Sequence, residues 1–143
     1  MKPAYDREVL DARLRELSKR LKRIEAKRPA SVAALARDED LQDILSRNLS
    51  LAIQTCIDVA MHLCAAHANV PQTVGDAFAQ LGKLKLVDKA LAQRMQLAAG
   101  FRNVLVHEYT EVDWDIVLRA TRAGTRDLEA FGKAIVSLLD DAG

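Results

Sequence analysis

Hydrophobic positions recur along most of the chain at the three- and four-residue spacing that is typical of α-helices. The first such stripe predicts a helix from about Tyr5 to Lys27. Pro29 ends it, because the residue before a proline is pushed out of the helical region. Residues 31–37 then form a short turn or lead directly into the next helix. The apolar positions of the first stripe are Leu10, Leu14, Leu17, Leu21 and Ile24.

A second helix is predicted from near Asp38 to about Ala68. From Leu49 onward it is apolar on most sides, which is expected of a central helix that other helices cover. Asn69 and Pro71 end it.

Two helices of different length come next. Thr73 predicts the start of a short helix that runs to about Leu81, with Gly82 just past its end. A longer helix is predicted from about Asp88 to Val106. Its expected buried positions are Leu91, Met95, Ala98, Phe101 and Leu105.

The last helix is predicted to begin at Asp113, where Val112 and Val117 match a hydrophobic staple around the cap. Gly124 lies in its inner stripe and is expected to let another backbone approach closely. Short joints between long amphipathic helices favour an antiparallel bundle. We therefore expect an all-α bundle of about five helices, forming one domain over residues 1–143.

Composition agrees with a helical fold, since the chain has only six Gly and three Pro. The net charge of +1 gives no global preference for nucleic acid or membrane. Residues 13–28, however, hold eight Lys or Arg against Glu16 and Glu25. That segment is either a phosphate-attracting surface or the solvated face of the first helix.

We expect no stretch to approach the roughly 20 apolar residues of a membrane span, and residues 1–8 lack the apolar core of a signal peptide. Cys56 and Cys64 would lie about 12 Å apart along one helix, too far for a disulfide. Two reduced thiols without an export signal predict a cytoplasmic protein that makes no membrane contact.

The candidate chemistry lies at the end of the fourth predicted helix. Arg102 carries a permanent charge on a planar fork that suits phosphate oxygens. His107 can take and give a proton near neutral pH. Together they supply what RNA phosphodiester cleavage needs without a metal or other cofactor. On a continuous helix the two positions lie about 140° apart, so they converge only if the helix ends near Val106 or the arginine wraps back.

The pattern Arg102, four residues, His107, one residue, Tyr109 resembles the signature of the HepT toxins. These toxins belong to the HEPN superfamily of small helical ribonucleases. The resemblance covers about residues 40–140. Beyond the motif it includes residues 51–60, which resemble the family's second-helix core, and Asp113 with Trp114, which resemble its entry to the last helix.

The resemblance implies a homodimer in which two motifs meet at the subunit interface, acting on RNA as a metal-independent endoribonuclease. Arg102 would bind the scissile phosphate, and His107 would transfer a proton at the 2′-hydroxyl or the leaving oxygen. Asn103 would position the motif or the substrate. The resemblance also implies that a nucleotidyltransferase antitoxin of the MntA type adenylylates Tyr109, which would block RNA binding.

Other polar positions have two interpretations each. Arg47, Gln54 and Asp58 share one stripe of the second predicted helix. This stripe is an exposed edge, or Asp58 is partly buried and pairs with Arg102 or His107 to orient the motif. Likewise, the last helix carries a basic stripe that is either a solvated face or an RNA track. Its members are Arg119, Arg122, Arg126 and Lys133.

A metal site is not expected from His62, Cys64 and His67, because positions 62 and 64 lie about 200° apart on a helix. Trp114 is expected to be a packing anchor. Two alternatives to a ribonuclease stay open. One is a non-catalytic HEPN subunit that binds a nucleotidyltransferase or nucleotides, and the other is a helical scaffold without a site.

Overall fold

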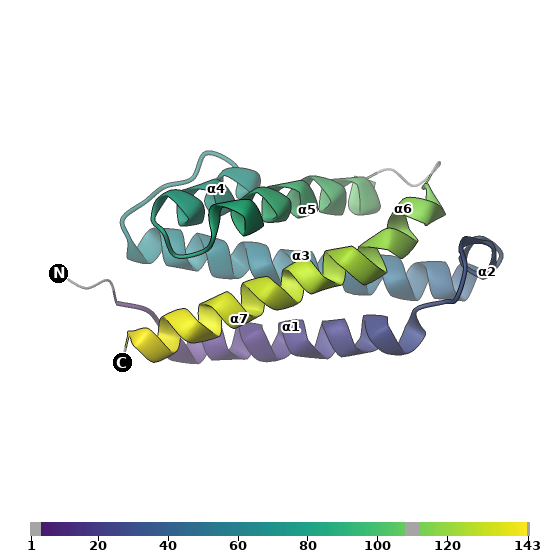
Figure 1. Ribbon diagram of the computed structural model, residues 1–143, viewed down its shortest axis with the longest axis horizontal. Coiled ribbons are helices and arrows are strands. Elements are labelled where there is room, and N and C mark those ends of the chain that lie inside the picture. Colours follow the sequence, from purple (N-terminus) through teal and green to yellow (C-terminus); the bar gives the residue numbers. More distant parts are fainter. Residues whose placement is uncertain (1–3, 108–111, 143) are drawn as a thin grey trace.

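The computed structural model describes residues 4–107 and 112–142, with the backbone alone at His107. All regular structure in these ranges is helical, and four long helices run lengthwise with the chain direction reversing from each to the next (Figure 1). Helices α6, η1 and α7 form one continuous helix, which is the last of the five predicted. The short α2 is therefore the one additional element in the described ranges. The elements are α1 (Arg7–Lys27), α2 (Val32–Ala36), α3 (Glu39–Ala66), α4 (Val74–Lys83), α5 (Lys89–His107), α6 (Trp114–Arg119), η1 (Ala120–Gly124) and α7 (Thr125–Asp141).

Side-chain caps determine where most of the helices begin. A carboxylate or hydroxyl just before the helix accepts a hydrogen bond from a backbone N–H in its first turn. This confirms the starts predicted from Asp38, Thr73 and Asp113. The first helix starts two residues later than predicted, because Asp6 is its cap and accepts from the N–H of Val9.

The end of α4 differs from the prediction. The helix continues through Gly82 to Lys83, and Lys85 takes the left-handed conformation (φ 60°) that closes the turn. Gly82 has a different reason to be small, since a Cβ at this position would lie 3.1 Å from the Cβ of Ala92. The glycine therefore allows α4 to pack closely on α5.

Helix α3 is the centre of the bundle and contacts α1, α4, α5 and α7. By length and composition it is apolar enough to cross a membrane, so the expectation that no such stretch exists was wrong. The covered core helix of a bundle meets the same criterion, and 56% of the apolar window is buried here. Phe78 of α4 and Phe131 of α7 complete this core with an edge-to-face contact at 5.5 Å.

The last helix contains a π turn, η1, between α6 and α7. The carbonyl of Thr121 in this turn accepts hydrogen bonds from the guanidinium of Arg28 (Nε at 2.8 Å) and from the hydroxyl of Thr125 (2.9 Å). The prediction for Gly124 was wrong, because a Cβ there would meet only Ala120 of the same helix, at an ordinary 3.5 Å.

Candidate functional site

A groove of about 660 Å³ lies between α3 and α5, next to the start of α6. We call it the α3–α5 groove. From α5 it is lined by Arg102, Leu105 and Val106, and before and within α6 by Val112 and Trp114. The α3 side is mostly polar and includes Gln42, Asp43, Ser46, Arg47, Ser50 and Gln54.

Arg102 reaches this groove because of its helical spacing. It lies seven residues after Met95 and eleven after Leu91, so all three share the face of α5 that packs on the bundle. At the end of the helix this face therefore changes from buried apolar residues to a half-buried arginine. The Nε atom of Arg102 is buried and has no hydrogen-bond partner among the described residues. Buried donors are normally paired, so the unpaired Nε makes Arg102 unusual among the polar residues that the structure describes.

The polar wall of α3 was only partly found from the sequence. Arg47 and Gln54 were recognised as a polar stripe, and both line the groove. Asp43, Ser46 and Ser50 line it too but were missed. Asp43 and Ser50 lie three or four residues from Arg47 or Gln54, and Ser46 lies four residues before Ser50. This helical spacing was the signal that would have found them.

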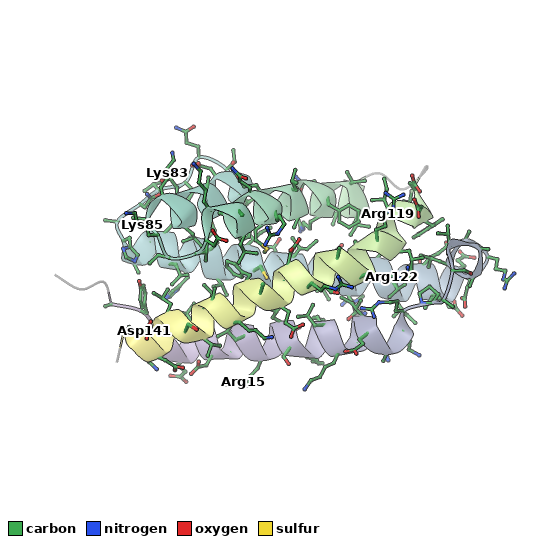
Figure 2. The ribbon with its side chains drawn as sticks, in the orientation of Figure 1. Arg15, Lys83, Lys85, Arg119, Arg122 and Asp141 are labelled. Atoms are coloured by element: carbon green, nitrogen blue, oxygen red, sulfur yellow. The ribbon has the colours of Figure 1, made fainter. Side chains whose placement is uncertain are left out.

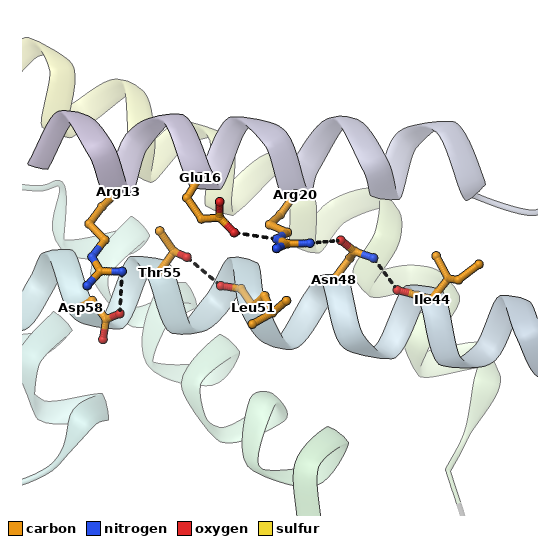
Figure 3. Close-up of polar contacts among 8 residues, drawn as sticks. All are labelled: Arg13, Glu16, Arg20, Ile44, Asn48, Leu51, Thr55 and Asp58. Atoms are coloured by element: carbon orange, nitrogen blue, oxygen red, sulfur yellow. Dashed lines mark hydrogen bonds and ion pairs between the residues drawn. The ribbon is translucent and has the colours of Figure 1, made fainter.

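Asp58 does not form the pair with Arg102 that one of its two interpretations required. Its Oδ1 accepts a hydrogen bond from Nε2 of Gln54 at 2.9 Å, and its Oδ2 lies 3.8 Å from Nη1 of Arg13 (Figure 3). Arg13 takes this place because α1 packs along α3. The expected pairing of Asp58 with His107 concerns a side chain outside the described part of the structure.

The rest of the predicted motif follows Arg102 on α5. Asn103 is exposed, and the helix runs on through His107. The described helix ends at His107, one residue after the predicted Val106, and within it positions 102 and 107 lie about 140° apart. Tyr109 lies outside the described residues.

Both basic segments have structural partners. On α1, Arg20 pairs with Glu16 at 2.8 Å and donates to Oδ1 of Asn48 at 3.2 Å (Figure 3). On the last helix Arg119 pairs with Asp115, and Figure 2 shows Arg119 and Arg122 near the same end of the bundle. These contacts give Arg20 and Arg119 partners within the fold, and both interpretations stay open for the other basic residues of the two segments.

The histidines of α3 hold the chain before α1. The hydroxyl of Tyr5 lies 2.6 Å from Nε2 of His67, and the N–H of Asp6 donates to Nε2 of His62 at 3.4 Å. Among the described residues, no three potential metal ligands cluster. Cys56 and Cys64 are buried free thiols, and burial raises the pKa of each. Thiols of this kind are protonated and unreactive.

A second, apolar groove of about 400 Å³ lies between α5 and the last helix. Two of its lining residues are large, apolar and exposed: Leu97 (75%) and Ile116 (48%). An ion pair between Arg94 and Asp127 at 2.8 Å lies beside them. This second groove leaves apolar surface uncovered on the helix that carries Arg102.

These features define a small all-helical bundle protein with an arginine in a polar groove. The sequence profile described as ribonuclease HepT-like matches residues 14–135. The chain therefore belongs to the HepT-like ribonuclease family, which confirms the resemblance found in the sequence.

Individual relatives agree with this assignment. The mRNA nuclease HepT of Shewanella oneidensis is 32% identical over 96 residues, which are 66% of this chain and 72% of that protein. The tRNA nuclease HepT of Aphanizomenon flos-aquae is 26% identical over 132 residues, or 92% of this chain and 90% of that protein. A solved structure of the tri-AMPylated Shewanella oneidensis HEPN toxin in complex with MNT antitoxin has a TM-score of 0.83 and 27% identity, and the match covers 90% of this chain and 97% of that one.

Proposed function

We propose that this protein is a metal-independent endoribonuclease toxin that acts on cellular RNA and is held inactive by a nucleotidyltransferase antitoxin. The observation that carries the proposal is the guanidinium of Arg102, which lines a polar groove with its Nε buried and unpaired among the described residues. The relatives named as mRNA and tRNA nucleases support RNA as the substrate.

Arg102 would bind the scissile phosphate, because its fork can donate two parallel hydrogen bonds to phosphate oxygens. The RNA 2′-hydroxyl would attack the adjacent phosphorus and the bond to the 5′ oxygen would break. The products are then a 2′,3′-cyclic phosphate and a free 5′-hydroxyl. His107 would remove the 2′-hydroxyl proton or protonate the leaving oxygen.

The separation of Arg102 and His107 around α5 supports a site that two protomers complete. Because α5 runs through His107, one helix presents the two positions about 140° apart. A homodimer with twofold symmetry brings the same face of both copies together. Two guanidinium and two imidazole groups could then surround one RNA strand, and one histidine could act as base while the other acts as acid.

The second groove supplies a surface for such a dimer. Leu97 and Ile116 are exposed and apolar there, and Leu97 belongs to the helix that carries the motif. Contact between two copies of this surface would cover both residues. It would also bring the two α5 helices together around Leu97, which lies near the middle of each helix.

Asn103 and Asp58 would have positioning roles. Asn103 is exposed one turn before His107, where its amide can bind the substrate or the imidazole of either protomer. Asp58 would act through Gln54, since its carboxylate holds the amide of this groove-lining residue at 2.9 Å.

Tyr109 would be the point of control. A tri-AMPylated HEPN toxin in complex with MNT antitoxin is a structural relative of this chain. Transfer of AMP to the Tyr109 hydroxyl would add negative charge and bulk beside Arg102 and His107, where RNA phosphate must bind. We place this antitoxin and its target RNA in the cytoplasm, where free thiols such as Cys56 persist.

The direct test uses purified protein, RNA and EDTA. The unmodified protein should cleave RNA and leave cyclic phosphate ends. Arg102→Ala and His107→Ala should each lose at least 100-fold in rate, whereas Lys83→Ala, which removes an exposed charge at the end of α4 that lines neither groove, should retain activity. Full activity in either motif variant would overturn the assignment. Nucleotidyltransferase binding without any RNA cleavage would instead establish the non-catalytic partner subunit.

The dimer is tested separately. Leu97→Asp should convert the protein to a monomer in light scattering and abolish cleavage, because a charge in this surface opposes its burial. Leu97→Met is the matched control. A fully active monomer would contradict a site shared between protomers.

A further inference from the structure

Trp114 gives the α3–α5 groove an aromatic wall. It follows the Asp113 cap at the start of α6, is half-buried, and packs against the core while also lining the groove. Figure 1 shows α6 at the end of the bundle where α3 begins and α5 ends. A packing anchor needs only burial, so exposure of this indole to the groove requires a further explanation.

The two walls of the groove complement a nucleotide. Base stacking on an aromatic ring is a general mode of binding single-stranded RNA. The α3 wall offers the other contacts that a flat base needs, since Gln42, Asp43 and Ser46 carry polar groups that can meet a base edge. The volume of about 660 Å³ lies within the usual range for small-molecule sites.

The charged side chains that line the groove change from negative to positive along α3. Asp43 lies one turn before Arg47, about 6 Å along the helix axis, and Arg47 lines the same groove as Arg102. Glu39, one turn before Asp43, lines the groove as well. A phosphate is attracted to the two arginines and repelled by the carboxylates of Glu39 and Asp43. The base of the same nucleotide would then lie toward Asp43 and Trp114.

We propose that this groove contains a nucleobase subsite in which Trp114 stacks the base and Asp43 selects guanine. Guanine presents two adjacent N–H donors on its Watson–Crick edge, and the two oxygens of a carboxylate accept both. Adenine and uracil do not present this pair of donors. The inference rests on the proposed ribonuclease function, and it makes guanine the preferred base beside the cleaved bond.

The chain has a single tryptophan, so its fluorescence reports on this groove alone. The purified protein is titrated with GMP, AMP, CMP and UMP, which carry no internucleotide bond to cleave. We expect saturable quenching, with GMP binding at least fivefold more tightly than the other three. Quenching that is absent, or equal for all four, overturns the subsite.

Two variants then test the named roles. Asp43→Asn should reduce the preference for GMP to within about twofold, while Asp40→Asn, an exposed carboxylate on the same turn that does not line the groove, should leave it unchanged. By calorimetry, Trp114→Leu should weaken GMP binding about tenfold or more and Trp114→Phe should retain most of it. A preference that survives Asp43→Asn, or GMP binding unaffected by Trp114→Leu, contradicts the assignment.

These measurements separate the subsite from the reaction. GMP binding in a protein that does not cleave RNA would refute the proposed function and leave the subsite intact. RNA cleavage at all four bases, without quenching by any nucleotide, would refute the subsite and leave the function intact.

Discussion

Replacing Arg102 by methionine should stabilise the fold while it abolishes function. The methionine side chain matches the aliphatic part of the arginine but has no donor to leave unpaired. A buried donor without a partner costs about 1–3 kcal/mol, and Nε of Arg102 is such an atom among the described residues. The arginine is only half-buried, so we expect the lower end, about 1 kcal/mol.

This gain is measurable in a chain of 143 residues. An unfolding entropy of about 2.1 cal/mol/K per residue makes 1 kcal/mol equivalent to a rise of about 3 °C in Tm. Urea unfolding followed by circular dichroism gives the free energy directly. All variants are compared at one protein concentration, since dimer formation would make the measured stability depend on it.

Arg94→Met is the matched control on the same helix. Arg94 pairs with Asp127 at 2.8 Å, and losing a partly exposed ion pair costs about 0–1 kcal/mol. The two variants should therefore change stability in opposite directions. If Arg102→Met is destabilised by 1 kcal/mol or more, the arginine is satisfied within the fold and the argument for an unpaired, ligand-seeking group is refuted.

Three further predictions concern stability and reactivity. Arg28→Ala should lower the free energy of unfolding by about 1.5–3 kcal/mol, because it removes the charged donors to the carbonyl of Thr121; a urea midpoint equal to that of the wild type would contradict this. Burial raises the pKa of the Cys56 thiol, so iodoacetamide should label it at pH 8 only in urea, and rapid labelling of the native protein would show that the core opens. Hydrogen bonds from the N–H of Gln72 and from a neighbouring amide lower the pKa of Asp76. The contribution of Asp76 to stability is thus present above the unfolded pKa of about 3.9 and lost as pH falls through the lower folded value. Asp76→Asn should therefore reduce the dependence of the unfolding free energy on acid pH. An unchanged dependence would exclude a stabilising role for this carboxylate.

Local chemistry made most helix starts predictable. The caps at Asp38, Thr73 and Asp113 act within three residues of themselves, so the sequence contains the whole interaction. The end of α4 was different, because Gly82 looked like a terminator while its small size serves a contact with Ala92 on another helix. No local pattern carries that information.

The candidate site was predictable to a similar degree. Arg102 was found because an arginine suits phosphate oxygens and because it precedes His107 by five residues, and both facts can be read from the sequence alone. The partner of Asp58 was not, since Arg13 comes from a helix whose packing fixes the contact. The π turn was also missed, and the contact between its Thr121 carbonyl and Arg28 joins residues 93 positions apart in the sequence.

The π turn also controls what the end of the last helix can present. Such a turn holds about one residue more than an α turn, and one residue corresponds to a rotation of about 100°. Deleting a single residue from the exposed pair at Arg122 and Ala123 would restore α geometry and revolve α6 about its axis relative to α7. Trp114 would then leave the wall that faces α3, although no atom of the motif had been altered. The loss of one peptide unit two turns away would thus remove the proposed stacking surface.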